Sequence, residues 1–584
     1  MISRILRLKS RGHFHVHGQA ADMPAQFVGV RSAHDTRTRN RIGILVAAFA
    51  FLFVVIGARL TQLGMMSPET TASIMMRPTT IASRPDLLDR NGELLATDVN
   101  MVSLFAEPNK VIDPDEVVEE LVKVIPDLDR KATYSRLVAK NSFQWLRRQL
   151  TPRQQSEILA LGLPGLGFRP EKRRFYPAGP VASHVVGHVN VDNLGLAGME
   201  RYLDNQGLAA LRELGLAAEG KLEPVRLSID LRVQTIVRDV IYRAMVDYKA
   251  AAAGAVVLDV ETGEILAMAS VPDYDPNMPS RLTEDGQVDR EYEKGWFNRM
   301  SNATYEMGST FKSFTLAMGL EANKITLDTV IDASKPIRMG GFTIRDFKGK
   351  YRPLSIREVF QYSSNIATAS VADMVGIEAH QAFLTRLGLL SKLQTELPEI
   401  ATPTQPRVWK KINATTISYG HGVSTTPLQT AVAGASLING GFLVPTTFLP
   451  RSREEAARLS KKVIKDETSK DMRELFVWNG LFGSGRSAQV AGFEVGGKTG
   501  TADKVVNGSY NSGLNFNAFL AGFPMSKPRY IVLAVIDGPR TGLNGGVTAG
   551  STAAPMVREI IARSGALLGV KPEFSRDGTL MVNY

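Results

Sequence analysis

The sequence predicts an α+β protein, in which an antiparallel sheet carries helices on its faces, for the second half of this 584-residue chain. Two runs rich in β-forming residues surround a turn in residues 253–270, and two more such runs follow much later, at 516–524 and 529–537. Helical patterns lie between these runs. This order favours a sheet that is completed by the two ends of one domain. The helices expected in it span 227–248, 309–322, 356–375 and 427–437.

Length and composition narrow the possible classes of protein. The length predicts two to four domains, and a content of 44% hydrophobic and 22% charged residues is typical of globular chains. The sequence has no cysteine, which excludes disulfides, thiolate metal sites and cysteine nucleophiles. Of the net charge of +11, residues 1–41 hold +6, with eight basic and two acidic residues. Since only +5 remains for the other 543 residues, nucleic-acid binding loses its main support.

An apolar segment follows this basic tail. Residues 42–58 carry no charge and are bounded by Arg41 and Arg59, which predicts a single transmembrane helix over 42–59. The excess of basic residues before it predicts a cytoplasmic tail, 1–41, and export of everything after the helix. A buried core helix and a cleaved signal peptide are the alternatives. The long basic region and the lack of a clear cleavage site before Pro68 favour an uncleaved anchor.

The region after the anchor, 60–224, is predicted to be an irregular α+β pedestal. The Asn91-Gly92 pair between two apolar runs predicts a β-hairpin. His184 and His188 have a spacing that could hold a metal on a helix, but no acidic ligands lie nearby, so we expect structural histidines and no metal site. A second domain is expected over 225–565, and a C-terminal tail over 566–584.

Three short motifs in the second domain carry chemically useful residues. Ser309 precedes an apolar helical pattern, so it could be a helix cap or a nucleophile. Lys312 is three residues further on, where its amine could take the serine proton. The other motifs are Ser363-Ser364-Asn365 and Lys498-Thr499-Gly500-Thr501.

Together and in this order, the motifs resemble the Ser-x-x-Lys, Ser-x-Asn and Lys-Thr-Gly set of penicillin-binding proteins and serine β-lactamases. The flanking sequence from about residue 84 to 562 resembles class B penicillin-binding proteins, the monofunctional peptidoglycan D,D-transpeptidases. Among them it is most similar to the division-specific FtsI type, or penicillin-binding protein 3. The resemblance implies a β-lactamase-like transpeptidase domain on a dimerisation-like pedestal. Met307 departs from the pattern, because the family usually has a proline there, which pre-shapes the turn into the helix.

The reacting groups follow from chemistry and resemblance together. Ser309 is the expected nucleophile, at a helix start where backbone N–H groups favour developing negative charge. By resemblance, the backbone N–H of Thr501 completes the oxyanion hole. Lys312 is the leading candidate for the base, which requires a neutral amine, and a charged Lys498 nearby could lower its pKa.

The other motif residues are expected to handle the substrate. Ser363 could pass a proton between a lysine and the leaving amine, and Asn365 could hold a peptide amide. Thr499 and Thr501 could hydrogen-bond a substrate carboxylate, while Gly500 leaves room for substrate along the strand edge.

The implied reaction is a two-step acyl transfer without metal or organic cofactor. Ser309 attacks the carbonyl between the terminal D-alanines of a peptidoglycan stem peptide, releases D-Ala, and passes the acyl group to an amine of a neighbouring strand. β-Lactams are expected to acylate Ser309 and stay attached. The resemblance further implies a single-pass inner-membrane protein with a periplasmic catalytic domain at the division septum. Its expected partners are an FtsW-type glycosyltransferase and other divisome membrane proteins.

Other functions remain open at this point. An elongation-type class B transpeptidase would share all these motifs, as would a catalytically silent scaffold of the divisome. A β-lactamase is disfavoured by the predicted anchor and pedestal, and a β-lactam sensor by the single predicted span.

Overall fold

The computed structural model describes residues 46–59, 61, 84–208, 222–283, 285–339, 341–506, 509–540 and 547–574, without the side chains of 342, 505, 506 and 509–512. The chain divides into two compact units, 1–79 and 80–584. In the first unit, residues 46–59 are helical and exposed. No helix within the described residues is both long and apolar enough to cross a membrane. The predicted basic tail and residues 42–45 of the predicted anchor lie outside the described residues.

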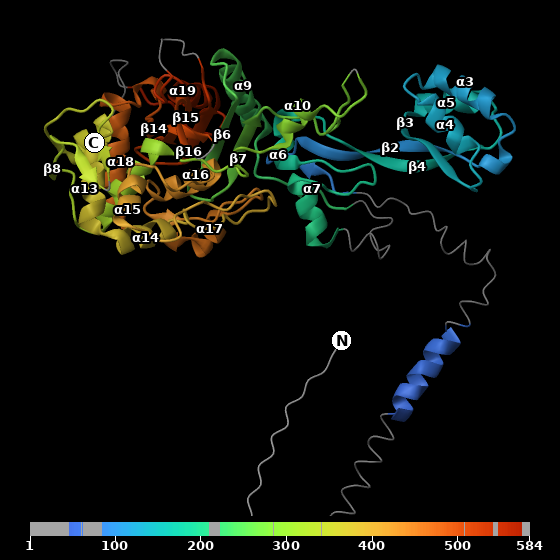
Figure 1. Ribbon diagram of the computed structural model, residues 1–584, viewed down its shortest axis with the longest axis horizontal. Helices are drawn as coiled ribbons and strands as arrows, with labels where there is room; N and C mark the ends of the chain where they lie inside the picture. The colour runs from blue at the N-terminus through green and yellow to red at the C-terminus, as the bar shows by residue number, and fades with distance from the viewer. Residues whose placement is uncertain are drawn as a thin grey trace, which may run out of the picture. The chain divides into compact units, whose positions relative to one another are not determined.

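The pedestal is built on a five-stranded sheet, whose strand β5 lies at 225–226, just beyond the predicted boundary at 224. Its order is β3-β2-β1-β5, with β4 also paired to β2, and Figure 1 shows β2 and β4 side by side. The predicted hairpin is confirmed, since β1 and β2 pair in antiparallel fashion around Gly92. The Asp89 carboxylate accepts from Asn91 N at 2.7 Å and Glu93 N at 2.8 Å, which closes this turn. The strands are β1 (Leu87–Leu88), β2 (Leu94–Ala106), β3 (Gln144–Leu150), β4 (Leu166–Phe175) and β5 (Val225–Arg226).

Helices cover one end of the pedestal sheet and enclose a small core around Leu104, Leu121 and Leu146. Side chains at their N-termini explain where two of them begin: Asp113 caps α3 and Thr151 forms a capping box with Gln154 at α5. The pedestal helices are η1 (Pro108–Lys110), α3 (Pro114–Val124), α4 (Arg130–Leu137), α5 (Pro152–Ala160), η2 (Gly179–Ala182), α6 (Ser183–Val186), α7 (Gly198–Leu203) and η3 (Asp204–Leu208).

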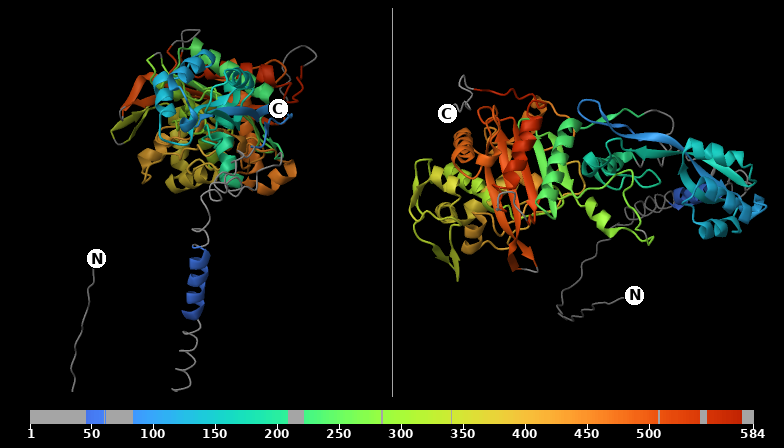
Figure 2. Two further views of the ribbon diagram at one scale, coloured as in Figure 1. Left: turned by 90° about the vertical axis from the view of Figure 1, so that its right-hand side faces the viewer. Right: turned by 90° about the horizontal axis from the view of Figure 1, so that it is seen from above.

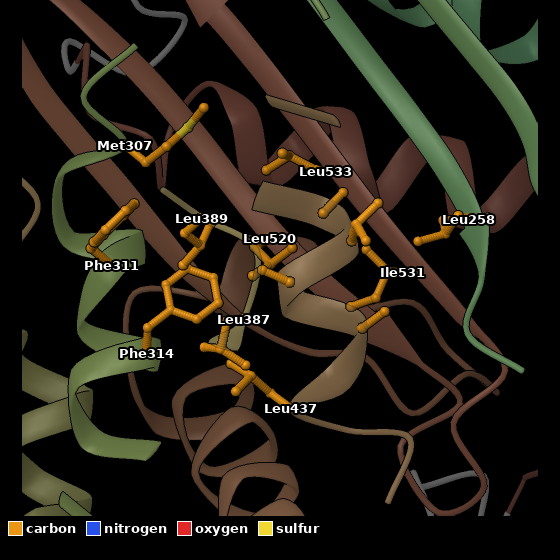
Figure 3. Packing of buried hydrophobic residues seen from close by; sticks show 14 of the residues in the cluster. Leu258, Met307, Phe311, Phe314, Leu387, Leu389, Leu437, Leu520, Ile531 and Leu533 are labelled. Atoms are coloured by element: carbon orange, nitrogen blue, oxygen red, sulfur yellow. The ribbon is translucent and has the colours of Figure 1, made fainter. Parts of the chain in front are cut away.

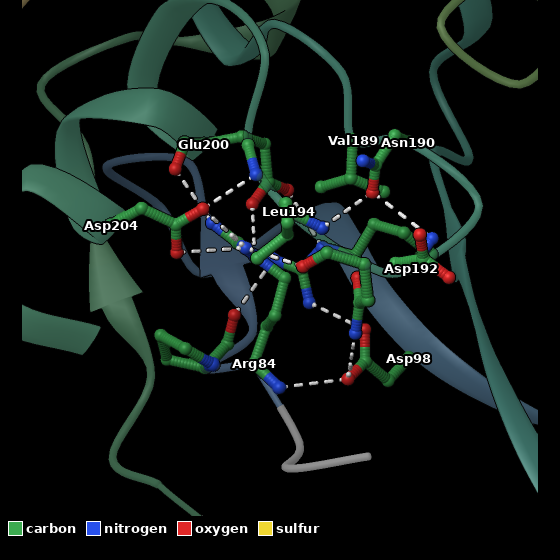
Figure 4. A network of polar contacts seen from close by, with 12 residues as sticks. Arg84, Asp98, Val189, Asn190, Asp192, Leu194, Glu200 and Asp204 are labelled. Carbon is green, nitrogen blue, oxygen red and sulfur yellow. Dashed lines mark hydrogen bonds and ion pairs between the residues drawn. The ribbon is translucent and has the colours of Figure 1, made fainter. Parts of the chain in front are cut away.

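A buried charge cluster (Figure 4) lies beside α7, at the end of the pedestal away from α3, α4 and α5 (Figure 1). The Arg84 guanidinium meets Glu200 at 2.5 Å and Asp204 at 3.0 Å. Arg174 meets the second oxygen of Glu200 at 2.7 Å and Asp98 at 3.1 Å. We call these five residues the pedestal ion cluster.

The two pedestal histidines are buried against protein groups. A ring nitrogen of His184 lies 2.7 Å from Gly295 O, and one of His188 lies 3.0 Å from the Tyr274 hydroxyl. Burial lowers the pKa of His184 to about 4, so its ring is neutral. Within the described part of the chain, no group of three or more His, Cys, Asp or Glu residues could hold a metal ion.

The second sheet contains the four predicted strands and a fifth, β14, that was not among them. Its order is β14-β15-β16-β6-β7 with every pair antiparallel, so the first and last strands of the domain complete one sheet. The strands are β6 (Ala252–Asp259), β7 (Ile265–Val271), β14 (Gly496–Val506), β15 (Ser509–Phe523) and β16 (Tyr530–Asp537).

Each face of this sheet carries its own hydrophobic core. Ile531 and Leu533 of β16 face one core and Val532 and Ala534 face the other, as the alternation of a strand requires. Helices α9 (Leu231–Asp247) and α19 (Ala553–Ser564) cover the second face (Figures 1 and 2). On the first face, Figure 3 shows residues of the helical segment that contains Ser309, among them Phe311 and Phe314, directed toward strand and loop residues.

The helical middle agrees with prediction at two of its three positions. The first is η5 (Gly308–Phe311) followed by α11 (Lys312–Glu321), and the last is α16 (Pro427–Ser436). The single helix predicted over 356–375 is wrong. Helix α12 (Ile356–Tyr362) ends at Ser363, whose φ of 58° and ψ of 46° are left-handed, and Ser364 caps α13 (Asn365–Val375) by accepting from Ala367 N.

The remaining elements surround these: α10 (Arg290–Glu293), η4 (Lys294–Trp296), β8 (Val330–Asp332), β9 (Ile337–Met339), β10 (Phe342–Ile344), β11 (Pro353–Ser355), α14 (Ile377–Arg386), α15 (Lys411–Ile417), β12 (Phe442–Leu443), α17 (Arg453–Leu459), β13 (Lys461–Lys462), α18 (Asp466–Phe482) and η6 (Arg486–Ala488).

Candidate active site

The predicted nucleophile lies in the first turn of a helix that begins as a 3-10 turn. Ser309 is the second residue of η5 and is half-buried, while Met307 occupies the N-cap position. Gly308 adopts a φ of +51°, and a Cβ added to it would lie 2.6 Å from the carbonyl oxygen of Thr501. This position therefore requires glycine, both for its backbone conformation and for close packing against β14. Ser309 starts the helix without being its cap.

Three motif side chains meet behind this turn. Lys312 Nζ donates to the Ser363 hydroxyl at 3.0 Å and also to the Ser363 carbonyl. Lys498 Nζ donates to the same hydroxyl at 3.0 Å and to Thr499 O at 3.3 Å. One hydroxyl thus lies between two amines that are 1% and 0% exposed. The left-handed backbone of Ser363 directs both its hydroxyl and its carbonyl toward Lys312.

Burial changes the protonation of both lysines. Desolvation lowers the pKa of Lys312 well below its ordinary value, and the neighbouring Lys498 lowers it further, while Asp346 acts in the opposite direction. Desolvation lowers the pKa of Lys498 to about 7. A neutral amine has a free lone pair, so Lys312 is suited to accept a proton near neutral pH.

An aspartate that sequence reasoning missed positions the second motif. The Asp346 carboxylate accepts from the Ser364 hydroxyl at 2.7 Å and from Ile366 N at 3.0 Å. Asn365, expected to hold a substrate amide, donates its own amide to Arg345 O at 2.8 Å. The only available signal was an acidic residue within a basic stretch, which does not identify its partner.

The third motif lies on β14, the edge strand of the main sheet. A Cβ on Gly500 would lie 2.2 Å from Met307 O, so the structure gives this glycine a packing role against the nucleophile turn, and room for substrate stays a prediction. The Thr499 hydroxyl lies 2.6 Å from the Ser484 hydroxyl. The Thr501 hydroxyl accepts from Ala549 N at 3.1 Å, which leaves its O–H available to donate.

A second missed group fixes the chain just before the nucleophile. Glu306 accepts from Gly422 N at 2.7 Å and lies 3.0 Å from His421 Nδ1. Gly420, with a φ of +96°, approaches Gly308 so closely that an added Cβ would lie 1.9 Å from its carbonyl oxygen. These contacts hold the turn that contains Ser309 in addition to its packing against β14. Glu306 and Gly422 are 116 positions apart in the sequence, so their contact could not be predicted from either segment alone.

The geometry as a whole suits acyl transfer to a serine. A half-buried hydroxyl at a helix start lies one turn from a buried amine of lowered pKa, and a second hydroxyl connects that amine to another. This arrangement provides a base and a route for a proton within one hydrogen-bonded group, one helical turn from the nucleophile.

Comparison with protein families gives two matches. The model of the penicillin binding protein transpeptidase domain matches residues 253–562, and that of the penicillin-binding protein dimerisation domain matches residues 79–215. The first includes all three motifs, and the second covers most of the pedestal.

Individual proteins are similar over nearly the full length. The chain is 36% identical to the probable peptidoglycan D,D-transpeptidase FtsI of Caulobacter vibrioides over 548 residues, which cover 91% of this chain and 89% of that protein. It is 32% identical to the probable peptidoglycan D,D-transpeptidase PenA of Neisseria meningitidis, over 92% of this chain and 94% of PenA. It is 28% identical to the peptidoglycan D,D-transpeptidase FtsI of Escherichia coli K12, over 91% and 92%.

Proposed function

Because the chain belongs to the penicillin-binding protein transpeptidase family, we propose that it is a serine-type peptidoglycan D,D-transpeptidase of the FtsI kind, which cross-links stem peptides during cell division. The observation that carries the proposal is the Ser363 hydroxyl between two buried amines, one of them a single turn from Ser309. This arrangement supports a serine acyl-enzyme mechanism.

In the acylation step, Ser309 Oγ attacks the carbonyl carbon between the two terminal D-alanines while its proton passes to neutral Lys312. The backbone N–H groups of Ser309 and Thr501 stabilise the oxyanion. When the C–N bond breaks, the proton passes through the Ser363 hydroxyl to the leaving amine, and D-Ala departs. The acyl group is now an ester of Ser309. β-Lactams acylate Ser309 through the same attack by its hydroxyl oxygen.

In the second step, an amine of a neighbouring stem peptide attacks the ester carbonyl. The amine loses a proton to the Lys312 and Ser363 pair, a new peptide bond forms, and Ser309 regains its hydroxyl hydrogen. Before D-Ala leaves in the first step, Lys498, Thr499 and Thr501 hold the carboxylate of the donor peptide's terminal D-Ala, with Gly500 beside it on the strand edge. Asn365 holds the peptide amide. The position of β14 at the edge of its sheet supports this placement, because an extended peptide can add to such an edge.

The location follows from sequence and family resemblance. The uncharged residues 42–58 between Arg41 and Arg59 support a single inner-membrane anchor with a cytoplasmic tail. Residues 60–224 then form the pedestal and 225–565 the periplasmic transpeptidase domain. We expect peptidoglycan and β-lactams as ligands, and an FtsW-type glycosyltransferase with other divisome membrane proteins as partners.

Labelling with a fluorescent penicillin tests the proposal. We expect the full-length protein to form a stable covalent adduct and Ser309→Ala to form none. Ser313→Ala is the matched control, because its buried hydroxyl has no hydrogen-bond partner among the described residues. Absence of label on the wild type would contradict the enzyme and favour a silent scaffold, and loss of label within seconds would indicate a β-lactamase. Depletion separates the cellular roles: filaments support division, and rounded cells support elongation.

A further inference from the structure

A short basic loop lies beside the catalytic serine motif. We define the basic loop as residues 343–352, with the sequence TIRDFKGKYR, which holds four basic residues and one acidic residue. Two aromatic side chains lie among the charges: Phe347 is 85% exposed and Tyr351 is 61% exposed. Within the described residues, Phe347 is the most exposed large hydrophobic side chain. Binding surfaces are enriched in aromatic and arginine side chains, and the basic loop carries both kinds at exposed positions.

The basic loop is bonded to the residues on both sides of Ser363. Its Arg345 carbonyl accepts from the Asn365 amide at 2.8 Å, and its Asp346 accepts from Ser364. On the other side, Lys350 Nζ lies 4.5 Å from the ring centroid of Tyr362. The loop is therefore fixed at the segment that carries the proton-relaying hydroxyl, with its aromatic and basic side chains directed outward.

The charge of the basic loop is mostly not neutralised by the protein itself. The acidic residue, Asp346, accepts a hydrogen bond from Ile366 N at the N-terminus of α13. Arg352 forms an ion pair with Glu358 at 2.5 Å. The ion pairs of the described part of the chain do not include Arg345, Lys348 or Lys350, and all three residues are exposed. A surface with this charge attracts an anionic partner.

We propose that the basic loop binds the carboxylates and sugar rings of a peptidoglycan strand that approaches Ser309 as acceptor. This inference rests on the proposed function, which brings a carboxylate-bearing glycopeptide to this segment in every reaction cycle. Lys348 and Lys350 pair with stem-peptide carboxylates, and Phe347 and Tyr351 contact the apolar faces of sugar rings. An acidic protein partner fits the charge as well, but the hydrogen bonds to Ser364 and Asn365 favour the strand that must reach the acyl ester.

Co-sedimentation of the full-length protein with purified peptidoglycan sacculi tests the loop. The variant is Phe347→Ala/Lys348→Gln/Lys350→Gln, and the matched control is Phe297→Ala/Lys324→Gln/Lys392→Gln, which changes the same residue types at exposed positions elsewhere. We expect affinity for sacculi to fall about tenfold in the loop variant, since two exposed charge pairs and one ring contact each contribute a fraction of this. The difference should shrink at high salt. The control should bind like the wild type.

Fluorescent penicillin labelling of the same proteins separates the hypothesis about the basic loop from the proposed transpeptidase function. Labelling of the loop variant at the wild-type rate, together with reduced sedimentation, supports the inference. If the wild type does not label, the proposed function fails, whatever the sacculi show. If the loop variant sediments like the wild type, or the control loses as much affinity, the basic loop is not the acceptor surface. If the loop variant sediments like the wild type but cells that carry it fail to divide, the basic loop binds an acidic protein partner instead. Lys348→Gln alone, with a smaller expected loss, repeats the test if the triple variant melts at a lower temperature.

Discussion

Two buried clusters in this protein contain basic side chains, and the clusters differ in the groups that these side chains contact. In the pedestal ion cluster, the guanidinium groups of Arg84 and Arg174 both contact Glu200, and all three side chains are 0% exposed. In the candidate active site, Lys312 and Lys498 are buried equally well, yet both donate to a neutral hydroxyl, that of Ser363. Burial is the same in the two clusters, and the partners differ.

The difference determines which groups keep their charge. Burial alone would lower the pKa of Arg174, but Glu200 and Asp98 outweigh it and the pKa is raised. For Lys312, burial and a neighbouring amine act in the same direction and lower the pKa. Buried cations with direct carboxylate partners therefore stay charged, whereas buried amines without such partners are suited to act as bases. The contrast predicts that substitutions in one cluster affect stability and those in the other affect chemistry.

The largest expected effect comes from Lys312→Met, which keeps the length and apolar body of the side chain and removes the base. We expect the rate of acylation by fluorescent penicillin to fall by about 10²- to 10⁴-fold, the usual contribution of general base catalysis. The free energy of unfolding should stay the same or rise, because a buried amine no longer has to be desolvated. Labelling kinetics and thermal melting measure the two quantities.

Lys411→Met is the control for this variant, since Lys411 is exposed and pairs with Asp373 on the surface. It should leave both quantities near the wild-type values. A loss of acylation below tenfold in Lys312→Met would assign the base to another group, of which Lys498 is the nearest candidate.

The reverse result is expected for Arg174→Met in the pedestal. The substitution leaves Glu200 and Asp98 in a buried site with fewer cations, which costs about 3–5 kcal/mol of folding free energy. The folded molecules should still be acylated within twofold of the wild-type rate. Urea unfolding measures the first effect, and labelling per folded molecule the second. Arg153→Met, on an exposed helix face, is the control. A slow acylation rate without loss of stability would mean that the pedestal cluster acts on the chemistry.

The sequence predicted the local parts of this protein well. Turn residues between apolar or β-forming runs identified both hairpins. The motifs located Lys312, Ser363 and Lys498, which the structure brings together, and Ser309 one turn before Lys312. Each of these patterns lies within a few consecutive residues, so it can be recognised without knowledge of the tertiary structure.

The contacts that were missed are long-range or depend on tertiary structure. The apolar periodicity predicted one helix where the structure has two, separated by the left-handed backbone of Ser363. A single residue with positive φ leaves the apolar pattern unchanged, so the pattern could not reveal the break. Glu306 meets Gly422 across 116 positions of sequence, and Asp346 meets Ser364 across 18. Carboxylates are common on surfaces, so neither could be assigned a partner from the sequence alone.

The two clusters should also differ in their response to pH. In the folded protein the pKa of Lys498 is about 7, and in the unfolded chain it returns to about 10.5. Between these values the unfolded state binds more protons, so the free energy of unfolding rises with pH, and below about pH 7 the contribution is constant. We expect Lys498→Met to remove up to about 1.4 kcal/mol per pH unit of this rise, the limit for one proton.

Arg174→Met provides the comparison, because its guanidinium does not titrate in this range. Urea unfolding from pH 7 to 10 should give Arg174→Met the wild-type slope and Lys498→Met a smaller one. Equal slopes in the wild type and Lys498→Met would mean that Lys498 stays charged in the folded protein, and the contrast between the clusters would not hold for it.

The smallest effect is expected for Met307→Pro, which restores the residue usual in the family. Met307 already has a φ of −78°, within the range of proline, so the substitution should stabilise the turn by about 0.4–1 kcal/mol through the unfolded state. Met307 is also 0% exposed in the core (Figure 3), and the shorter side chain gives up apolar burial worth about 1 kcal/mol. Since these effects oppose each other, we expect thermal stability within about 1 kcal/mol of the wild type and acylation within threefold. An acylation rate more than tenfold faster would show that the methionine turn, and not the protonation of the buried amines, limits attack by Ser309.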